Sequence, residues 1–196
     1  MAEYTSRSFD LLTLGQLLLR LSPPDNDRLS RGDTFVKQVG GAELNVAVGA
    51  SLLGLRTGVI SKLPSHDIGS FMKGKIRSFG VSDDFFMYDD SPSARVGIYY
   101  YENGAYPRKP KVIYDRMNSS FFSLNIDEIP KEVYTASKCF HTTGITLALS
   151  PQIRETTIEM IKRFKEAGTL VSFDVNFRGN LWSGDEAREC ILKILP

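Results

Sequence analysis

The feature that most constrains this chain is a pair of glycines between a short apolar strand and a helix. Residues 35–39 read Phe-Val-Lys-Gln-Val, Gly40 and Gly41 follow, and the pattern predicts a helix directly after them with Glu43 in its first turn. Glycine permits positive φ and lets a ligand approach the main chain closely. A helix N-terminus at such a turn suits a polar or anionic ligand, although an ordinary strand-to-helix junction has the same pattern.

The helix after the glycine pair is amphipathic, and Gly54 is expected to end it. Small residues on it, Ala47 and Ala50, allow close packing. Its apolar positions, which we expect to face the core, are Leu44, Val48, Leu52 and Leu55.

Strands and helices alternate through the first half of the chain. Residues 9–15 and 57–61 are predicted strands, the next helix starts near Ser65 or Asp67, and residues 85–88 form another strand. This β-α-β-α-β order predicts a layered α/β domain with a mainly parallel sheet.

Two strands without an intervening helix then follow, at residues 94–102 and 111–117. A hairpin at this point is expected to leave the main sheet. Together with the extended segment before Gly40, it predicts a small separate sheet, a lid, made from residues of about 16–39 and 94–117.

The α/β order resumes with a predicted strand at residues 139–144. Ser150 and Pro151 form a helix start, residues 169–173 form a strand, and Ser183 with Glu186 forms a capping box for a last helix. Because an α/β sheet rarely ends on a helix with no strand to follow, we expect the chain to be incomplete.

Composition narrows the function. The chain has 196 residues with 24 Lys+Arg and 23 Asp+Glu, so its net charge of +1 gives no sign of a nucleic-acid or membrane-surface partner. Residues 1–10 lack the apolar core of a signal peptide, and Cys139 and Cys190 are isolated, which favours reduced thiols. We therefore expect a cytoplasmic protein.

Polar residues follow the predicted strands where ligands bind in open α/β sheets. These positions are Gly15-Gln16, residues 40–45, residues 141–146 and residues 174–178. Among them, His141 more commonly represents a satisfied half-buried group than a base, Asp174 could simply cap a turn, and Asn45 could face solvent.

The predicted lid adds a face of tyrosine and arginine. Tyr99 and Tyr101 are two residues apart on one strand and share a face, as do Tyr114 and Arg116 on the next. Such a face can hydrogen-bond hydroxyls and bind a carboxylate or phosphate. Packing of the tyrosines and a surface ion pair for the arginine are the plainer alternatives.

The motifs together closely resemble the ribokinase-like (PfkB) sugar kinases. The resemblance begins with Gly-Gly-Ala-Glu-Leu-Asn-Val-Ala at residues 40–47 and continues through Leu53-Gly54 and residues 67–69. Further stretches look like the branch that phosphorylates 2-keto-3-deoxygluconate: residues 97–99, 112–116, 143–150, 174–178 and 181–182.

This resemblance implies a three-layer α/β/α domain spanning residues 9–196 with a small β-sheet lid over a sugar site. It also implies ATP with Mg²⁺ and phosphoryl transfer to a primary hydroxyl of a keto-sugar acid. The residues implied to bind the sugar are Gly40, Gly41, Asn45, Tyr99, Tyr114, Arg116 and Arg178, the last at the acid end.

Two departures from the family pattern stand out. Arg20 occupies the position where many relatives have an aspartate that grips sugar hydroxyls, and this fits an acidic substrate. The family's catalytic aspartate, in a Gly-Ala-Gly-Asp type motif, has no match here, so we expect this base and the ATP-binding half to lie beyond the chain end. The isolated chain should then be inactive.

Alternatives to a kinase for 2-keto-3-deoxygluconate remain. One is a kinase for fructose or 5-keto-2-deoxygluconate, and another is a non-catalytic module for sugar-acid binding or dimerisation. The Tyr- and Phe-rich hairpin is the kind of surface that pairs between subunits, so a homodimer through the lid is predicted.

Overall fold

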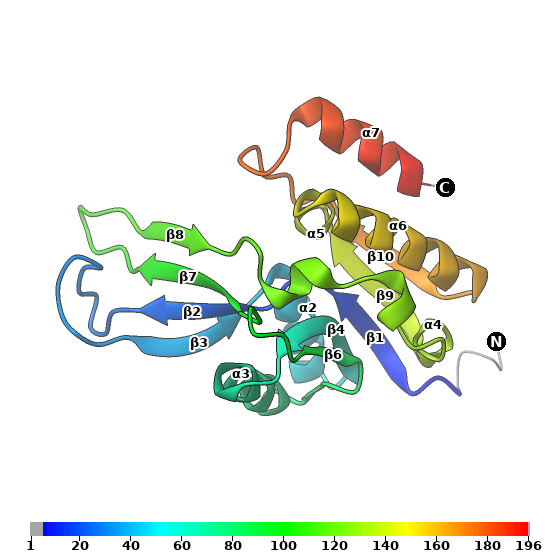
Figure 1. The fold of residues 1–196 in the computed structure, drawn as a ribbon, viewed down its shortest axis with the longest axis horizontal. Coiled ribbons are helices and arrows are strands. Elements are labelled where there is room, and N and C mark those ends of the chain that lie inside the picture. Colours follow the sequence, from blue (N-terminus) through cyan, green and yellow to red (C-terminus); the bar gives the residue numbers. More distant parts are fainter. Residues whose placement is uncertain (1–5, 196) are drawn as a thin grey trace.

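The structure is a computed structural model that describes residues 6–195, and its larger sheet is entirely parallel (Figure 1). Its strand order is β10-β9-β1-β4-β5, and β6 also pairs with β4. The bounds are β1 Phe9–Leu14, β4 Thr57–Pro64, β5 Val81–Ser82, β6 Phe86–Asp89, β9 Ser137–Thr143 and β10 Leu170–Asp174.

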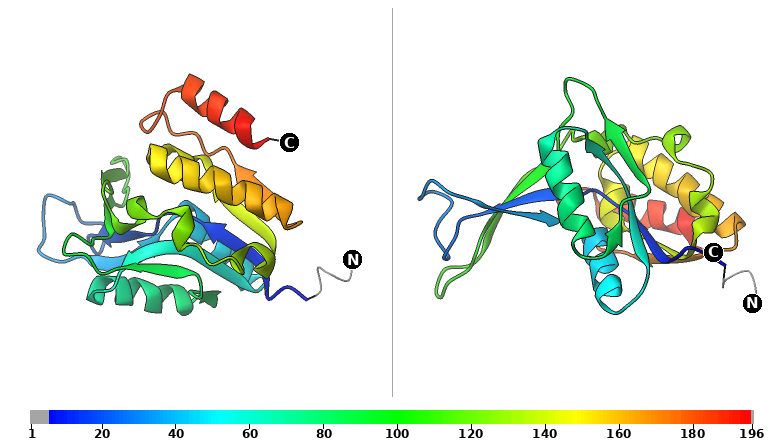
Figure 2. Two further views of the ribbon diagram at one scale, coloured as in Figure 1. Left: turned by 45° about the vertical axis from the view of Figure 1, so that its right-hand side comes forward. Right: turned by 90° about the horizontal axis from the view of Figure 1, so that it is seen from below.

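A second sheet of four strands, which we call the lid sheet, projects from one end of the main body (Figures 1 and 2). Its order is β3-β2-β7-β8, with β2 parallel to β7 and the outer pairs antiparallel. The bounds are β2 Leu18–Ser22, β3 Val36–Gly40, β7 Gly97–Glu102 and β8 Lys111–Asp115. The predicted class, a three-layer α/β/α domain with a mainly parallel sheet and a small second sheet, is confirmed.

Helices cover both faces of the main sheet. The longer ones are α2 Ala42–Leu52, α3 Asp67–Arg77, α6 Pro151–Glu166 and α7 Gly184–Ile194, and the short ones are α4 Val133–Ala136, α5 Gly144–Ala148, η1 Ser120–Ser123 and η2 Ile126–Glu128. Ser150 accepts a hydrogen bond from the Ile153 amide, and Ser183 with Glu186 forms the expected capping box. Both predicted helix starts are confirmed.

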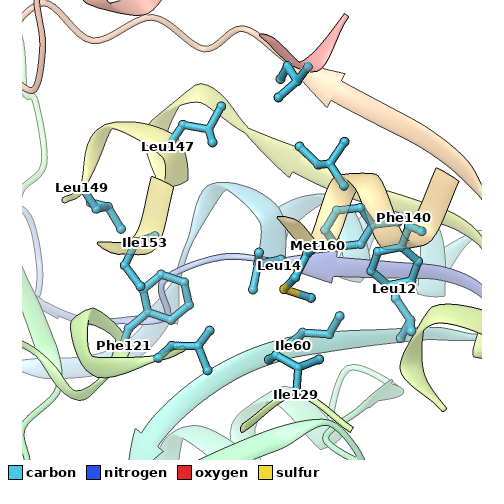
Figure 3. Packing of buried hydrophobic residues seen from close by; sticks show 14 of the residues in the cluster. Leu12, Leu14, Ile60, Phe121, Ile129, Phe140, Leu147, Leu149, Ile153 and Met160 are labelled. Atoms are coloured by element: carbon cyan, nitrogen blue, oxygen red, sulfur yellow. The ribbon is translucent and has the colours of Figure 1, made fainter. Parts of the chain in front are cut away.

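The alternation of side chains along β1 and β4 produces two cores. Leu12, Leu14 and Ile60 face α6 and pack with Met160 and Phe140 (Figure 3). Val59 and Leu63 point to the other face, where they pack with residues of α2 and α3. The sheet is thereby buried on both sides, and its strands end at the base of the lid sheet.

Three local predictions were wrong or missing. The cap of α3 is His66, whose side chain accepts a hydrogen bond from the Ile68 amide, rather than Ser65 or Asp67. Leu52 and Leu55, expected in the core, are 74% and 47% exposed because α2 ends at Leu52 and its last turn extends past the sheet. The two-residue strand β5 was not predicted, since it is too short to show a period.

Two findings bear on the environment of the protein. Cys139 and Cys190 are both free thiols, as predicted. Within residues 6–195, no helix combines the length and apolar character needed to cross a membrane.

Candidate functional site

A pocket of about 550 Å³ lies between the lid sheet and the first turn of α2. The lid contributes aromatic and cationic side chains, and the main domain contributes the glycine turn and the loop after β10. The lining residues that matter for recognition are Gln16, Arg20, Gly41, Glu43, Asn45, Tyr99, Tyr101, Tyr114, Asp115, Arg116, Ile145, Arg178 and Asn180.

The structure brings six of the seven sugar-binding residues suggested by the resemblance to this pocket: Gly41, Asn45, Tyr99, Tyr114, Arg116 and Arg178. The seventh, Gly40, lies directly behind it. A Cβ on Gly40 would be 2.6 Å from the Tyr99 hydroxyl oxygen, so the tyrosine packs against bare backbone there. The position of these residues is established, whereas their roles in binding stay predictions.

The glycine turn leaves the start of α2 open toward the pocket. Gly41 is the N-cap at φ 156°, and no side chain caps the helix. A Cβ on Gly41 would lie 2.9 Å from the Gln16 carbonyl oxygen, so this approach of two backbones requires glycine. The unmatched amides of the first turn are therefore available to a polar ligand.

The lid presents a layered face of rings and guanidinium groups. The rings of Tyr99 and Tyr114 are 5.9 Å apart, and the Arg20 guanidinium lies 4.3 Å from the centre of the Tyr101 ring. Burial raises the pKa of Tyr99, so its hydroxyl keeps its proton and can donate a hydrogen bond. This face of the lid therefore presents hydroxyl donors and positive charge to the pocket.

Two arginines approach the pocket from opposite sides. Arg116 follows β8 in the lid, is partly buried, and donates from Nε to Gln16 Oε1 at 2.8 Å. Arg178 lies on the exposed loop after β10, where Nη1 donates to the Phe177 carbonyl at 3.3 Å. Burial lowers the pKa of Arg116, yet arginine stays charged at neutral pH. With Arg20, which also lines it, the pocket thus carries three permanent cations.

Glu43 is a pocket residue whose contacts the sequence did not reveal. Its carboxylate is 2% exposed, and Oε1 accepts hydrogen bonds from Thr143 Oγ1 at 2.6 Å and Thr146 Oγ1 at 2.7 Å. Burial raises its pKa, and the threonines and Arg116 oppose that rise. The sequence signal that could have indicated its burial is its position next to Leu44, on a helix expected to face the core.

Two polar residues highlighted in the sequence lie outside the pocket lining. His141 is buried on β9, its Nδ1 is 3.0 Å from Ser172 Oγ, and burial lowers its pKa. Asp174 accepts a hydrogen bond from the Asn176 amide at 3.0 Å and stabilises the turn after β10. The plainer interpretation, a turn cap, therefore describes Asp174. The satisfied half-buried group expected at His141 is wrong, because the residue is buried and its Nε2 has no hydrogen-bond partner among the described residues.

The pocket is equipped for binding rather than for proton abstraction. The carboxylates among its lining residues are Glu43, held by two threonines, and Asp115, which pairs with Arg95 at 2.8 Å. Over residues 6–195, no cluster of three His, Cys, Asp or Glu side chains fits a metal ion. No chemical step is therefore assigned through Mg²⁺ here.

The comparisons with known proteins agree with this geometry. The family model described as pfkB family carbohydrate kinase matches residues 8–196. The 2-dehydro-3-deoxygalactonokinase of Haloferax volcanii is 39% identical over 95% of this chain and 58% of its own length. The 2-dehydro-3-deoxygluconokinase of Bacillus subtilis is 31% identical over 88% of this chain and 53% of its own. The chain thus spans little more than half the length of these relatives.

Solved structures give the same result. The crystal structure of 2-dehydro-3-deoxygluconokinase from Thermotoga maritima superposes with a TM-score of 0.88 at 34% identity, covering 94% of this chain and 56% of that one. Other relatives include a 5-dehydro-2-deoxygluconokinase of Clostridium beijerinckii at 29% identity and a probable fructokinase of Arabidopsis thaliana at 32%. A similar sugar kinase of Pyrococcus horikoshii, at 28% identity, was solved in complex with ATP.

Proposed function

The chain belongs to the pfkB family of carbohydrate kinases, and we propose that its pocket binds a 2-keto-3-deoxy sugar acid for phosphorylation by ATP. The observation that carries the proposal is the pair of arginines, Arg116 and Arg178, lining one pocket from the lid and from the main domain. Each guanidinium can pair with carboxylate oxygens, whereas a neutral sugar offers neither of them a charged partner.

The remaining pocket residues fit the neutral part of such a substrate. In the proposal, the open amides at Gly41 and the Asn45 side chain hydrogen-bond sugar hydroxyls. Tyr99 and Tyr114 cover the sugar from the lid and exclude water from it. Arg178 receives the acid end from the main domain, and Arg116 pairs with the same carboxylate from the lid.

ATP and Mg²⁺ belong to the proposal through the family. ATP supplies the phosphoryl group, and Mg²⁺ neutralises charge on the phosphates when both are bound. Among the described residues, the two carboxylates that line the pocket, Glu43 and Asp115, are both paired, so we expect the 196-residue chain to show no ordinary kinase turnover in a coupled ADP-release assay. Turnover near that of a typical kinase would contradict the assignment of the pocket as a binding site without a base.

The configuration of the sugar at C4 is a further choice. The relatives named for galactonate and gluconate act on epimers that differ there. A kinase for 5-keto-2-deoxygluconate, also an acid, is the second candidate, favoured by a relative of that name and by the same two arginines. A fructose kinase would bind the neutral sugar more tightly than the acids. A non-catalytic sugar-acid module would bind an acid without phosphorylating it.

A binding panel tests the proposal. Isothermal titration calorimetry would compare 2-keto-3-deoxygluconate, its C4 epimer, 5-keto-2-deoxygluconate and fructose on the 196-residue chain. We expect a 2-keto-3-deoxy acid to bind at least tenfold more tightly than fructose. Tightest binding of fructose would overturn the acid assignment and favour the fructokinase alternative.

We also propose a homodimer that pairs through the lid sheet. All five residues of β8 are exposed, and the apolar ones among the exposed lid side chains are Phe35, Val36, Val112 and Ile113. Analytical ultracentrifugation should show a dimer that Ile113→Lys dissociates; a monomer at high concentration would contradict it. Location in the cytoplasm is also a proposal, supported by the two free thiols.

A further inference from the structure

Gln16 is a buried amide in the connection from β1 to β2, where the chain leaves the main sheet for the lid. It is 3% exposed and lies at the carboxyl end of β1, one residue after Gly15. A glutamine is seldom fully buried unless its polar atoms are satisfied. The partners of its amide therefore indicate what it does.

The amide makes three hydrogen bonds, all to the segment that follows β8. Oε1 accepts from Arg116 Nε at 2.8 Å, and Nε2 donates to the Arg116 carbonyl at 3.0 Å and to Ser119 Oγ at 2.7 Å. The orientation of the amide is unambiguous, because a guanidinium can only donate and a backbone carbonyl can only accept. The Gln16 side chain thus hydrogen-bonds to both the backbone carbonyl and the guanidinium of Arg116.

The hydrogen bonds with Gln16 leave the two terminal guanidinium nitrogens of Arg116 available to a ligand. Only Nε is engaged by Gln16, and within residues 6–195 the two terminal nitrogens make no hydrogen bond. The guanidinium also lies 5.7 Å from the centre of the Tyr114 ring, which limits its rotation on one side. A paired set of donors is therefore held in place at the pocket wall before any ligand arrives.

The surroundings of Gln16 are built closely around this arrangement. A Cβ on Gly97 would lie 2.9 Å from Gln16 Nε2 and 3.3 Å from Arg116 Cα, so only glycine leaves room for the amide to reach across. The contact joins positions 100 residues apart and connects the main domain to the end of the lid sheet.

We propose that Gln16 is a positioning residue that holds Arg116 in the orientation in which it pairs with the carboxylate of a sugar acid. The inference rests on the proposed function. An arginine fixed in advance loses less conformational freedom on binding, so Gln16 increases affinity for the acid through Arg116. Its effect should be confined to ligands that carry the carboxylate.

The test compares an acid with its neutral counterpart. 2-Keto-3-deoxygluconate and 3-deoxyfructose, in which an alcohol replaces the carboxylate, would be titrated into the unaltered chain and into Gln16→Met, Gln16→Glu and Arg116→Met. We expect Gln16→Met to lower acid affinity about tenfold and 3-deoxyfructose affinity less than twofold. Gln16→Glu should lower acid affinity further, because its carboxylate pairs with Arg116 and competes with the ligand.

Matched controls separate positioning from general damage. Gln38→Met makes the same chemical change at an exposed lid position outside the pocket and should leave both affinities unchanged. Equal loss for the acid and 3-deoxyfructose in Gln16→Met would overturn the inference and indicate a merely structural role. Full acid preference in Gln16→Met would overturn it as well.

A wrong assignment of the proposed function would give a different binding result from a wrong assignment of Gln16. If the unaltered chain shows no preference for the acid, or if Arg116→Met keeps that preference, the acid assignment itself is wrong. Should the Gln16 variants fail to fold, NMR of the unaltered protein decides the matter. We expect a slowly exchanging Arg116 Nε–H resonance without ligand, and rapid exchange of that proton would overturn the inference.

Discussion

The two sheets of this protein contain strands of similar composition in opposite surroundings. All eight residues of β4, at the centre of the main sheet, are buried, whereas all five residues of β8 in the lid are exposed. Helices cover both faces of the parallel sheet. The lid sheet lines the pocket, and part of it, including Leu19 and Ile98, packs with residues of α3. We therefore expect the main sheet to contribute most of the stability of the fold, and the lid sheet to contribute mainly to binding of the ligand.

The difference also explains where the polar contacts lie. In the main sheet, some buried polar side chains pair internally, as with Thr142 Oγ1, which donates to the Leu14 carbonyl at 3.0 Å. Others, such as Thr13 Oγ1 and Ser137 Oγ, have no hydrogen-bond partner among the described residues. In the lid, the tyrosine hydroxyls and the ends of Arg116 point toward the pocket volume. A substitution in one sheet should thus change a different measurement from a substitution in the other.

The largest expected effect comes from the core of the main sheet. Phe140 is fully buried, and its ring stacks on Phe164 at a centroid distance of 4.1 Å. Phe140→Ala should lower the free energy of unfolding by about 3–5 kcal/mol. In urea titrations, Phe35→Ala in the lid, where the side chain is 45% exposed, should cost about 1 kcal/mol or less. An equal loss of unfolding free energy in the two variants would contradict the view that the main sheet contributes more to stability than the lid.

The second prediction concerns the two arginines, one from each region. Arg116→Met and Arg178→Met should each weaken binding of the sugar acid by about 10- to 100-fold, as expected for hydrogen bonds to a charged group. Arg178→Met should unfold at the same urea concentration as the unaltered chain, whereas Arg116→Met leaves the buried Gln16 Oε1 without its donor and should unfold at a lower one. Arg31→Met on an exposed lid loop is the control and should leave affinity unchanged. An effect of Arg178 alone would mean that the lid does not reach the ligand.

Much of this architecture could be predicted from the sequence because it depends on local signals. The starts of α6 and α7 follow from Ser150 and Ser183, whose side chains bond to amides within their own first turns. The alternating elements likewise identified the fold class. The start of α3 near Asp67 was right, but its cap was mistaken because histidine is an uncommon cap; His66 Nδ1 accepts a hydrogen bond from the Ile68 amide.

The candidate site was predictable only in part. The family motifs pointed to residues that the structure does place around one pocket, but the contacts that organise the pocket join distant positions. Glu43 bonds to Thr143, 100 residues away, and Gln16 bonds to Arg116 over the same separation. Neither pairing leaves a periodic or local mark in one sequence, so both emerge only from the fold.

The third prediction concerns the buried carboxylate at the junction of the two regions. Burial raises the pKa of Glu43, so the folded state holds a proton that the unfolded state has already lost above the ordinary glutamate value. Stability should therefore fall as pH rises from that value to the raised one, with a slope of at most about 1.4 kcal/mol per pH unit.

Glu43→Gln keeps Oε1 as an acceptor for both threonines and removes the titration. Urea unfolding between about pH 4 and 8 should show a shallower decline for this variant than for the unaltered chain. The nearby charge of Arg116 is present in both proteins, so it cancels in the comparison. Parallel curves would mean that Glu43 is not the group responsible.

The smallest expected effect lies where the lid meets the glycine turn. A Cβ on Gly40 would approach the Tyr99 hydroxyl to 2.6 Å and its Cε1 to 3.0 Å, and the end of a side chain can move where backbone cannot. Gly40→Ala should therefore leave the fold intact, displace the tyrosine, and weaken sugar-acid binding by about threefold to tenfold, or roughly 0.7–1.4 kcal/mol. Gly49→Ala on α2, where a Cβ meets nothing within 4 Å, is the matched control in the same calorimetric titration. If both variants bind equally well, Tyr99 does not contribute to the ligand contact, and the lid acts through Arg116 alone.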